Sequence, residues 1–129
     1  MKKVLLLASI LLFSKYSFAT NVYEQKLYHQ LKEASASAHR DADFPIYAKN
    51  VANLTQSLDQ YKRSGGENQH LQTAGGEFLK ALNSWAKAKL GERSGEAYKQ
   101  NMRDRQASLS SADSHILIYE SESKVSKMP

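Results

Sequence analysis

Residues 45–61, PIYAKNVANLTQSLDQY, carry the pattern that decides the fold. Their large apolar side chains follow one another at steps of four and three residues: Tyr47, Val51, Leu54, Leu58 and Tyr61. That spacing places them on one face of an α-helix, as in the seam of a helical bundle. Pro45 suits the first turn of a helix, and the glycines of residues 64–66 suit its end. The segment therefore predicts one amphipathic helix between these boundaries.

The same spacing recurs before and after this segment. An earlier helix is expected to begin at Asn21, which forms a capping-box pattern with Glu24, and its apolar face would consist of Leu27, Leu31, Ala34 and Ala38. A later helix has a stripe made of Phe78, Leu82 and Trp85. Because a glycine inside a helix costs about 1 kcal/mol relative to alanine, we expect this helix to start near Gly75 and Gly76, with Thr73 as its N-cap. Gly91 marks its end.

The longest seam lies in the last third of the chain: Tyr98, Met102, Arg105, Leu109, Ala112, Ile116 and Tyr119. It predicts a fourth helix beginning after Ser94. Serine and aspartate favour caps over helix interiors, so residues 95–119 form either one helix or two helices with a break near residues 110–113. The polar segment 120–129 is expected to be a flexible tail.

The sequence thus predicts an all-α fold, a small up-down bundle of about four helices over residues 20–119. The fourth helix is the longest of them. One of its ends should therefore protrude from the bundle or fold back.

The first nineteen residues have the pattern of a cleavable secretory signal peptide. Lys2 and Lys3 precede the apolar run 4–13, which is too short to cross a bilayer, and residues 17–19 provide small side chains for cleavage after Ala19. An uncleaved anchor is the alternative. The paired lysines and the short apolar run are typical of bacteria, so we expect the processed chain to be periplasmic or secreted, with no membrane span.

Charge and composition exclude several classes of function. The chain has 18 Lys and Arg against 13 Asp and Glu, but Lys2, Lys3 and Lys15 leave with the signal, and the other basic residues are scattered among carboxylates. We therefore expect no nucleic-acid binding. With no cysteine, the chain has no thiolate zinc site, no covalent c-type haem and no thiol nucleophile. It also lacks a serine-hydrolase elbow and a phosphate-binding loop, so we expect no enzyme activity.

Arg105 and Met102 are the first two candidate contact residues. Arg105 is charged on an apolar seam, so it must extend to solvent, pair with a carboxylate such as Glu24, Glu33 or Asp59, or reach a ligand. Met102 lies on the same seam. Together with His70 or His115 it has the side chains needed for noncovalent haem ligation, although methionine on such a stripe more often fills space in the core.

Tyr28 is the third candidate, because it fits the apolar stripe poorly and an exposed tyrosine is a common interface anchor. Two pairs, His29 with Glu33 and His39 with Asp43, have the i,i+4 spacing that lets both side chains hold one metal ion. Each pair supplies fewer than three ligands, so ordinary surface ion pairs are favoured. We expect no metal and no cofactor.

These observations predict an exported helical protein that binds another envelope or secreted protein as an accessory, inhibitor or immunity-type factor. The alternative is a carrier of haem, a metal or a small ligand in the interior of the bundle, lined by Met102, Arg105 and a histidine. The sequence does not determine the oligomeric state or the identity of the partner.

Overall fold

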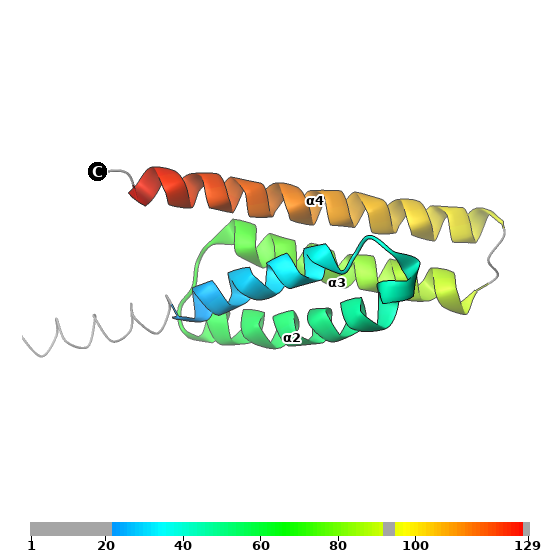
Figure 1. Cartoon of the computed structure of the whole chain (residues 1–129), viewed down its shortest axis with the longest axis horizontal. Coiled ribbons are helices and arrows are strands. Elements are labelled where there is room, and N and C mark those ends of the chain that lie inside the picture. The colour runs from blue at the N-terminus through cyan, green and yellow to red at the C-terminus, as the bar shows by residue number, and fades with distance from the viewer. Residues whose placement is uncertain (1–21, 92–94, 128–129) are drawn as a thin grey trace, which may run out of the picture.

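The computed structural model describes residues 22–91 and 95–127, and within these ranges it contains helices and no strand. A first helix covers residues 22–36. It is followed by the short 3-10 helix η1 (Asp41–Asp43) and by three long helices, α2 (Phe44–Arg63), α3 (Gln69–Leu90) and α4 (Glu96–Lys127). The four long helices run alternately up and down (Figure 1). The predicted all-α, up-down bundle is confirmed.

The predicted apolar stripes meet in one core. Its buried members come from all four helices and, in the case of Ala38, from the loop after the first helix: Leu27, Leu31, Ala34, Ala38, Tyr47, Val51, Leu54, Tyr61, Leu71, Ala74, Phe78, Ala81, Trp85, Leu109, Ala112 and Ile116. Leu58, Leu82 and Tyr119 are half-buried and pack against this core. None of the described helices is long and apolar enough to cross a membrane. The predicted signal peptide and the capping residue Asn21 lie outside the described residues.

The start of α3 corrects the sequence prediction. The helix begins at Gln69, where the side chain of Asn68 accepts hydrogen bonds from the amides of His70 and Leu71. Gly75 and Gly76 lie inside the helix instead of at its start. A Cβ atom on Gly75 would lie 3.1 Å from a methyl group of Leu58, so the glycine lets α2 and α3 approach closely. Interhelical packing here outweighs helix propensity.

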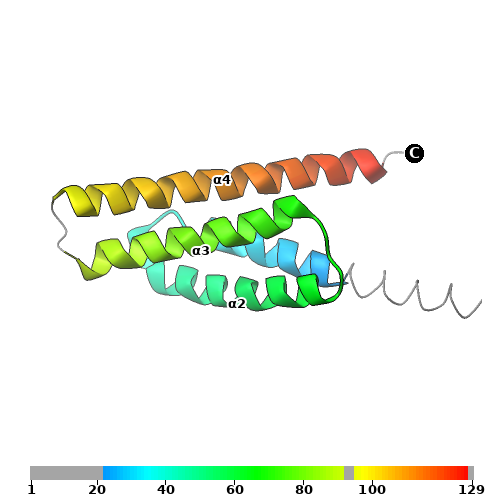
Figure 2. The same cartoon turned by 180° about the vertical axis from the view of Figure 1, so that it is seen from behind.

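Helix α4 is continuous from Glu96 to Lys127, with no break near residues 110–113. Asp113 accepts a 2.7 Å hydrogen bond from Ser35 of the first helix, so its side chain does not compete for the backbone of its own helix. The helix also continues past Tyr119, which corrects the predicted tail for residues 120–127. Figures 1 and 2 show α4 beside α3, with its C-terminal end extending beyond the other helices.

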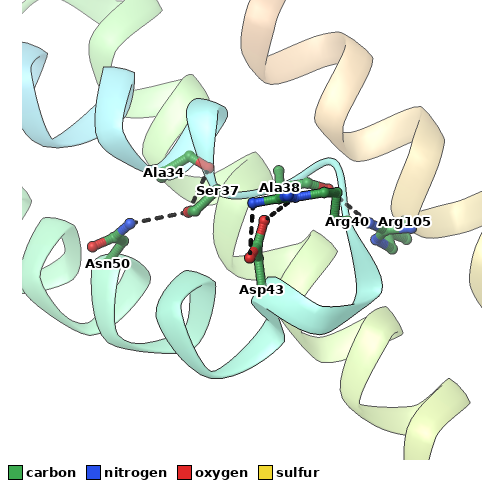
Figure 3. A network of polar contacts seen from close by, with 7 residues as sticks. All are labelled: Ala34, Ser37, Ala38, Arg40, Asp43, Asn50 and Arg105. Carbon is green, nitrogen blue, oxygen red and sulfur yellow. Dashed lines mark hydrogen bonds and ion pairs between the residues drawn. The ribbon is translucent and has the colours of Figure 1, made fainter.

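The connection between the first helix and α2 is held by local polar contacts (Figure 3). Arg40 forms an ion pair with Asp43, with 2.9 Å between Nε and Oδ2. Asn50 of α2 donates a 3.0 Å hydrogen bond to the hydroxyl of Ser37, which in turn donates to the carbonyl of Ala34. These contacts fix the loop from which two neighbours of Arg105 come, Ala38 and Asp41.

Candidate functional site

Arg105 extends from α4 toward the loop that follows the first helix (Figure 3). Its Nη2 donates a 2.6 Å hydrogen bond to the carbonyl oxygen of Ala38. Its guanidinium carbon lies 3.8 Å from the centroid of the Trp85 ring, which is a cation–π contact. Its buried Nε has no hydrogen-bond partner among the described residues. Arg105 therefore joins α4 to both α3 and the loop.

Trp85 is fully buried and has a polar contact of its own. Its indole Nε1 donates a 2.8 Å hydrogen bond to Oδ1 of Asp41, while Nζ of Lys89 lies 3.5 Å from Oδ2 of the same carboxylate. Lys89 also lies over the ring of Phe44, which meets Trp85 edge to face at 5.1 Å between centroids. Arg105 thus contacts the face of the indole, and Asp41 accepts the hydrogen bond of the indole nitrogen.

The predicted carboxylate partners of Arg105 were wrong. Glu24 accepts hydrogen bonds from two tyrosines, and Glu33 and Asp59 form ion pairs with His29 and Arg63 on their own helices. Burial lowers the pKa of Arg105, and the charge of Asp41 opposes this shift. An arginine with its ordinary pKa above 12 remains charged at neutral pH. The aromatic face, the Ala38 carbonyl and the nearby charge of Asp41 take the place of the expected carboxylates.

Met102 lines a small pocket next to this cluster. The pocket has a volume of about 30 Å³ and is lined by Asp41, Trp85, Ala88, Lys89, Tyr98 and Met102. A cavity needs roughly 10–15 Å³ to hold one water molecule, so this pocket has room for a water or two. Met102 and Arg105 are therefore near neighbours around Trp85, as the seam predicts, but they do not enclose a space of ligand size.

The histidines expected to accompany Met102 lie elsewhere. Met102 and His115 are thirteen residues apart on one continuous helix, which separates them by about 20 Å at 1.5 Å per residue. His70 lies against His115 instead, with 2.9 Å between their Nδ1 atoms. The structure thus does not bring Met102 and either histidine together as a pair of axial ligands.

Tyr28 lies at the other end of the bundle, about 22 Å along α4 from the level of Arg105. Its hydroxyl donates a 2.8 Å hydrogen bond to Glu120, and its ring lies 5.4 Å from that of Tyr119. Burial raises the pKa of Tyr28, and the hydrogen bond to Glu120 and the charge of that carboxylate raise it further. Tyr28 is half-buried in a contact between the first helix and α4.

Glu24 connects this end of the bundle to α2 and α4. It accepts hydrogen bonds from the hydroxyls of Tyr61, at 3.3 Å, and Tyr119, at 3.1 Å. The Tyr61 hydroxyl also accepts a 2.9 Å bond from the Asn68 amide, at the start of α3. Sequence reasoning placed Glu24 in a helix cap and missed this role. Two seam tyrosines at the same end of the bundle were the signal that a buried acceptor was needed.

The two predicted metal pairs form local contacts. His29 and Glu33 lie 3.0 Å apart, and the His29 side chain is 75% exposed. Asp43 pairs with Arg40, while His39 is exposed. In residues 22–91 and 95–127, no three histidine or carboxylate side chains gather closely enough to hold a metal ion.

The outer face of α4 has a second heptad-spaced stripe that sequence reasoning overlooked. All five of its members are exposed and uncharged: Ala107, Ser110, Ser114, Leu117 and Ser121. Leu117 is 66% exposed, and its neighbour Ile118 is 41% exposed. Each member lies five residues after a member of the seam, so counting the 3,4 spacing on both faces of the helix would have found it.

Comparisons with protein-family profiles, with curated proteins and with solved structures find no match to this chain.

Proposed function

We propose that this protein acts by binding another protein in the cell envelope or outside the cell, and that the partner packs a helix against the outer face of α4. The observation that carries the proposal is the exposed, uncharged stripe with Leu117 near one end. These side chains face solvent, so their 3,4 spacing does not contribute to the packing of the core. It matches the pattern by which one helix recognises another.

The chemistry of the stripe suits a partner helix. Alanine and serine side chains are short and allow two helices to approach closely, while Leu117 and Ile118 offer apolar surface of the kind that is buried at the centre of an interface. Charged side chains are depleted at interface centres, and none occupies the stripe itself. Arg103, Asp104 and Glu122 lie next to it as exposed rim residues.

The small size of the pocket beside Met102 supports binding at the surface over transport of a ligand at that place. The pocket beside Met102 holds about 30 Å³, far below the roughly 300 Å³ at which small-molecule sites begin. Arg105, the charge that a carrier would use, is already engaged by Trp85 and Ala38. Export is an independent part of the proposal and is supported by the sequence of residues 1–19.

The test compares wild type with Leu117→Arg and with a matched control, Leu79→Arg. Leu79 lies on α3 and is 41% exposed, so an arginine there adds the same charge away from the stripe. Each protein is expressed in its own host, crosslinked in intact cells and recovered from the envelope and secreted fractions. Mass spectrometry identifies both the captured protein and the N-terminus of the chain.

The proposal expects wild type and Leu79→Arg to capture the same protein and Leu117→Arg to lose it while keeping a wild-type helical circular dichroism spectrum. Equal capture by all three proteins contradicts docking on α4. Recovery of only a second copy of the chain would show self-association and contradict a separate partner. An unprocessed N-terminus, or recovery from the cytoplasm alone, would contradict export.

A further inference from the structure

His70 and His115 meet between α3 and α4 in an arrangement that neither a metal site nor an ordinary surface contact explains. Their Nδ1 atoms are 2.9 Å apart, their ring centroids are 5.1 Å apart, and the ring planes differ by 32°. The distance between the centroids is thus close to the distance between the two nitrogens plus the distance from each nitrogen to the centre of its own ring. The two nitrogens point straight at each other, which is the geometry of a hydrogen bond through one shared proton.

Glu122 indicates how the protons are distributed. Its Oε1 lies 3.7 Å from Nε2 of His70, on the side of the ring that faces away from His115. The carboxylate favours the tautomer of His70 that carries its proton on Nε2. In that tautomer the lone pair of Nδ1 is free to accept a hydrogen bond. Nδ1 of His115 must then be the donor. In this assignment both rings are neutral, and one proton lies between them.

We propose that His70 and His115 form a pH-sensitive latch that fastens the start of α3 to the C-terminal half of α4 and opens when both rings become charged. The pair accepts one extra proton without breaking, because Nε2 of His115 can take it and a charged donor strengthens the bond. A second extra proton must go to Nδ1 of His70. That proton removes the acceptor and places two positive charges across the contact.

The neighbouring charges modulate this latch without cancelling it. On α4, Glu122 is a carboxylate that faces the pair, with its Oε1 3.7 Å from Nε2 of His70. On α3, Glu77 lies two turns further along and is paired with Lys80, and Glu67 is exposed in the loop before the helix. His70 itself occupies the first turn of α3, where the positive end of the helix dipole opposes another positive charge.

Opening of the latch has a structural consequence. Leu71 and Ile116, the chain neighbours of the two histidines, are both buried in the core. Separation of the helices at this end would expose them next to Leu117 and enlarge the apolar surface of α4. Opening requires a hydrogen on both Nδ1 atoms, so acidification is the expected trigger. The inference concerns the isolated protein and stands whether or not a partner binds to α4.

The first experiment measures denaturant unfolding of the purified protein from pH 7.5 to 5.0 in EDTA, with Trp85 fluorescence as the reporter. Wild type is compared with the double variant His70→Gln/His115→Gln and with His39→Gln, which removes an exposed histidine in the loop after the first helix. The closed contact has no place for a second extra proton, because both Nδ1 atoms would then carry a hydrogen, whereas the rings of the unfolded chain have no such restriction. The folded state of wild type should therefore weaken relative to the double variant as the pH falls, by at most about tenfold in the unfolding constant per pH unit, which is the limit for one proton.

A second measurement reports opening directly and does not depend on the double variant being stable. The chain has no cysteine, so spin labels on Gln69→Cys and Ser121→Cys attach only at the start of α3 and in the C-terminal part of α4. The distance between the labels should increase between pH 7 and pH 5 and return on neutralisation. Identical pH slopes for wild type and the double variant, or an unchanged label distance at pH 5, would overturn the latch. So would a contact at pH 7 that EDTA abolishes, since a metal ion would then be the bridge.

Discussion

The guanidinium carbon of Arg105 lies 3.8 Å from the centroid of the Trp85 ring, and this contact connects the two longest helices of the bundle. A charged side chain on an apolar seam loses hydration when the helices pack. The aromatic face, the carbonyl of Ala38 and the charge of Asp41 offset part of that cost. The contact therefore determines how α4 lies against α3 near the loop that contains Asp41.

Arg105→Ala should lower the free energy of unfolding by about 2–3 kcal/mol, because it removes the cation–π contact, the packing of the side chain and the bond to Ala38. Arg105→Lys should lose less, since it keeps the charge but not the planar stacking. Urea unfolding followed by Trp85 fluorescence measures both. Arg103→Ala is the control on the same helix and should stay within about 0.5 kcal/mol of wild type.

Asp41→Ala should cost about 1–2 kcal/mol, more than Lys89→Ala, although the two residues form one ion pair. The aspartate accepts the hydrogen bond of the fully buried Trp85 indole, and its loss leaves that donor without this partner. The lysine contributes a half-exposed ion pair and a contact with Phe44, worth well under 1 kcal/mol. Thermal unfolding of both variants checks the order, and a larger loss for Lys89→Ala would contradict it.

Gly76→Ala should raise the free energy of unfolding by about 0.5–1 kcal/mol, because alanine restricts the unfolded chain and favours helix. A Cβ atom at this position meets nothing within 4 Å. Gly75→Ala has the same propensity gain, but its Cβ would lie 3.1 Å from a methyl group of Leu58. The Gly75→Ala protein should therefore be the less stable of the two by about 1 kcal/mol. Equal stabilities in urea would mean that α2 moves aside at no cost.

Alkaline pH should loosen the end of the bundle at Glu24. Burial raises the pKa of Tyr119 to about 12, and the charge of Glu24 contributes to the shift, whereas tyrosine ordinarily titrates near 10. Between these values the folded state holds a proton that the unfolded state has lost, so stability is full below pH 10 and falls as the pH rises toward 12. Stability curves measured across this range should be flatter for Tyr119→Phe than for wild type.

Tyr98→Phe provides the control, because it leaves Glu24 and its hydrogen bonds in place at the opposite end of α4. Its stability should decline with pH as steeply as that of wild type. A Tyr119→Phe curve as steep as wild type would show that another group causes the alkaline loss.

The apolar periodicity predicted the helices and the members of the core well. Tyr47, Val51, Leu54 and Tyr61 are buried as their spacing requires, and α2 begins and ends where Pro45 and the glycines indicate. The first helix behaves in the same way, whereas in the seam of α4 Leu109, Ala112 and Ile116 are buried and the other four members are half-buried. A 3,4 pattern depends on local geometry alone, so it can be counted without knowing which helices are neighbours.

The start of α3 and the partners of the polar side chains could not be predicted in this way. Gly75 lies inside a helix because Leu58 of another helix packs against it, and propensity has no access to that contact. Glu24 was expected in a cap, and Arg105 was expected to extend to solvent, pair with a carboxylate or reach a ligand. Both instead meet aromatic residues that are distant in the chain, namely Tyr61 and Tyr119 for Glu24 and Trp85 for Arg105.

By itself, then, the sequence determined the fold class, the helical faces and most of the core, because each of these follows from the repeat of apolar residues along one helix. Only the tertiary structure decided that His70 bonds His115, that Arg105 stacks on Trp85 and that Met102 lies far from both histidines. Those relationships depend on the order and register in which helices pack. Polar side chains take whichever partner that packing brings within hydrogen-bond distance.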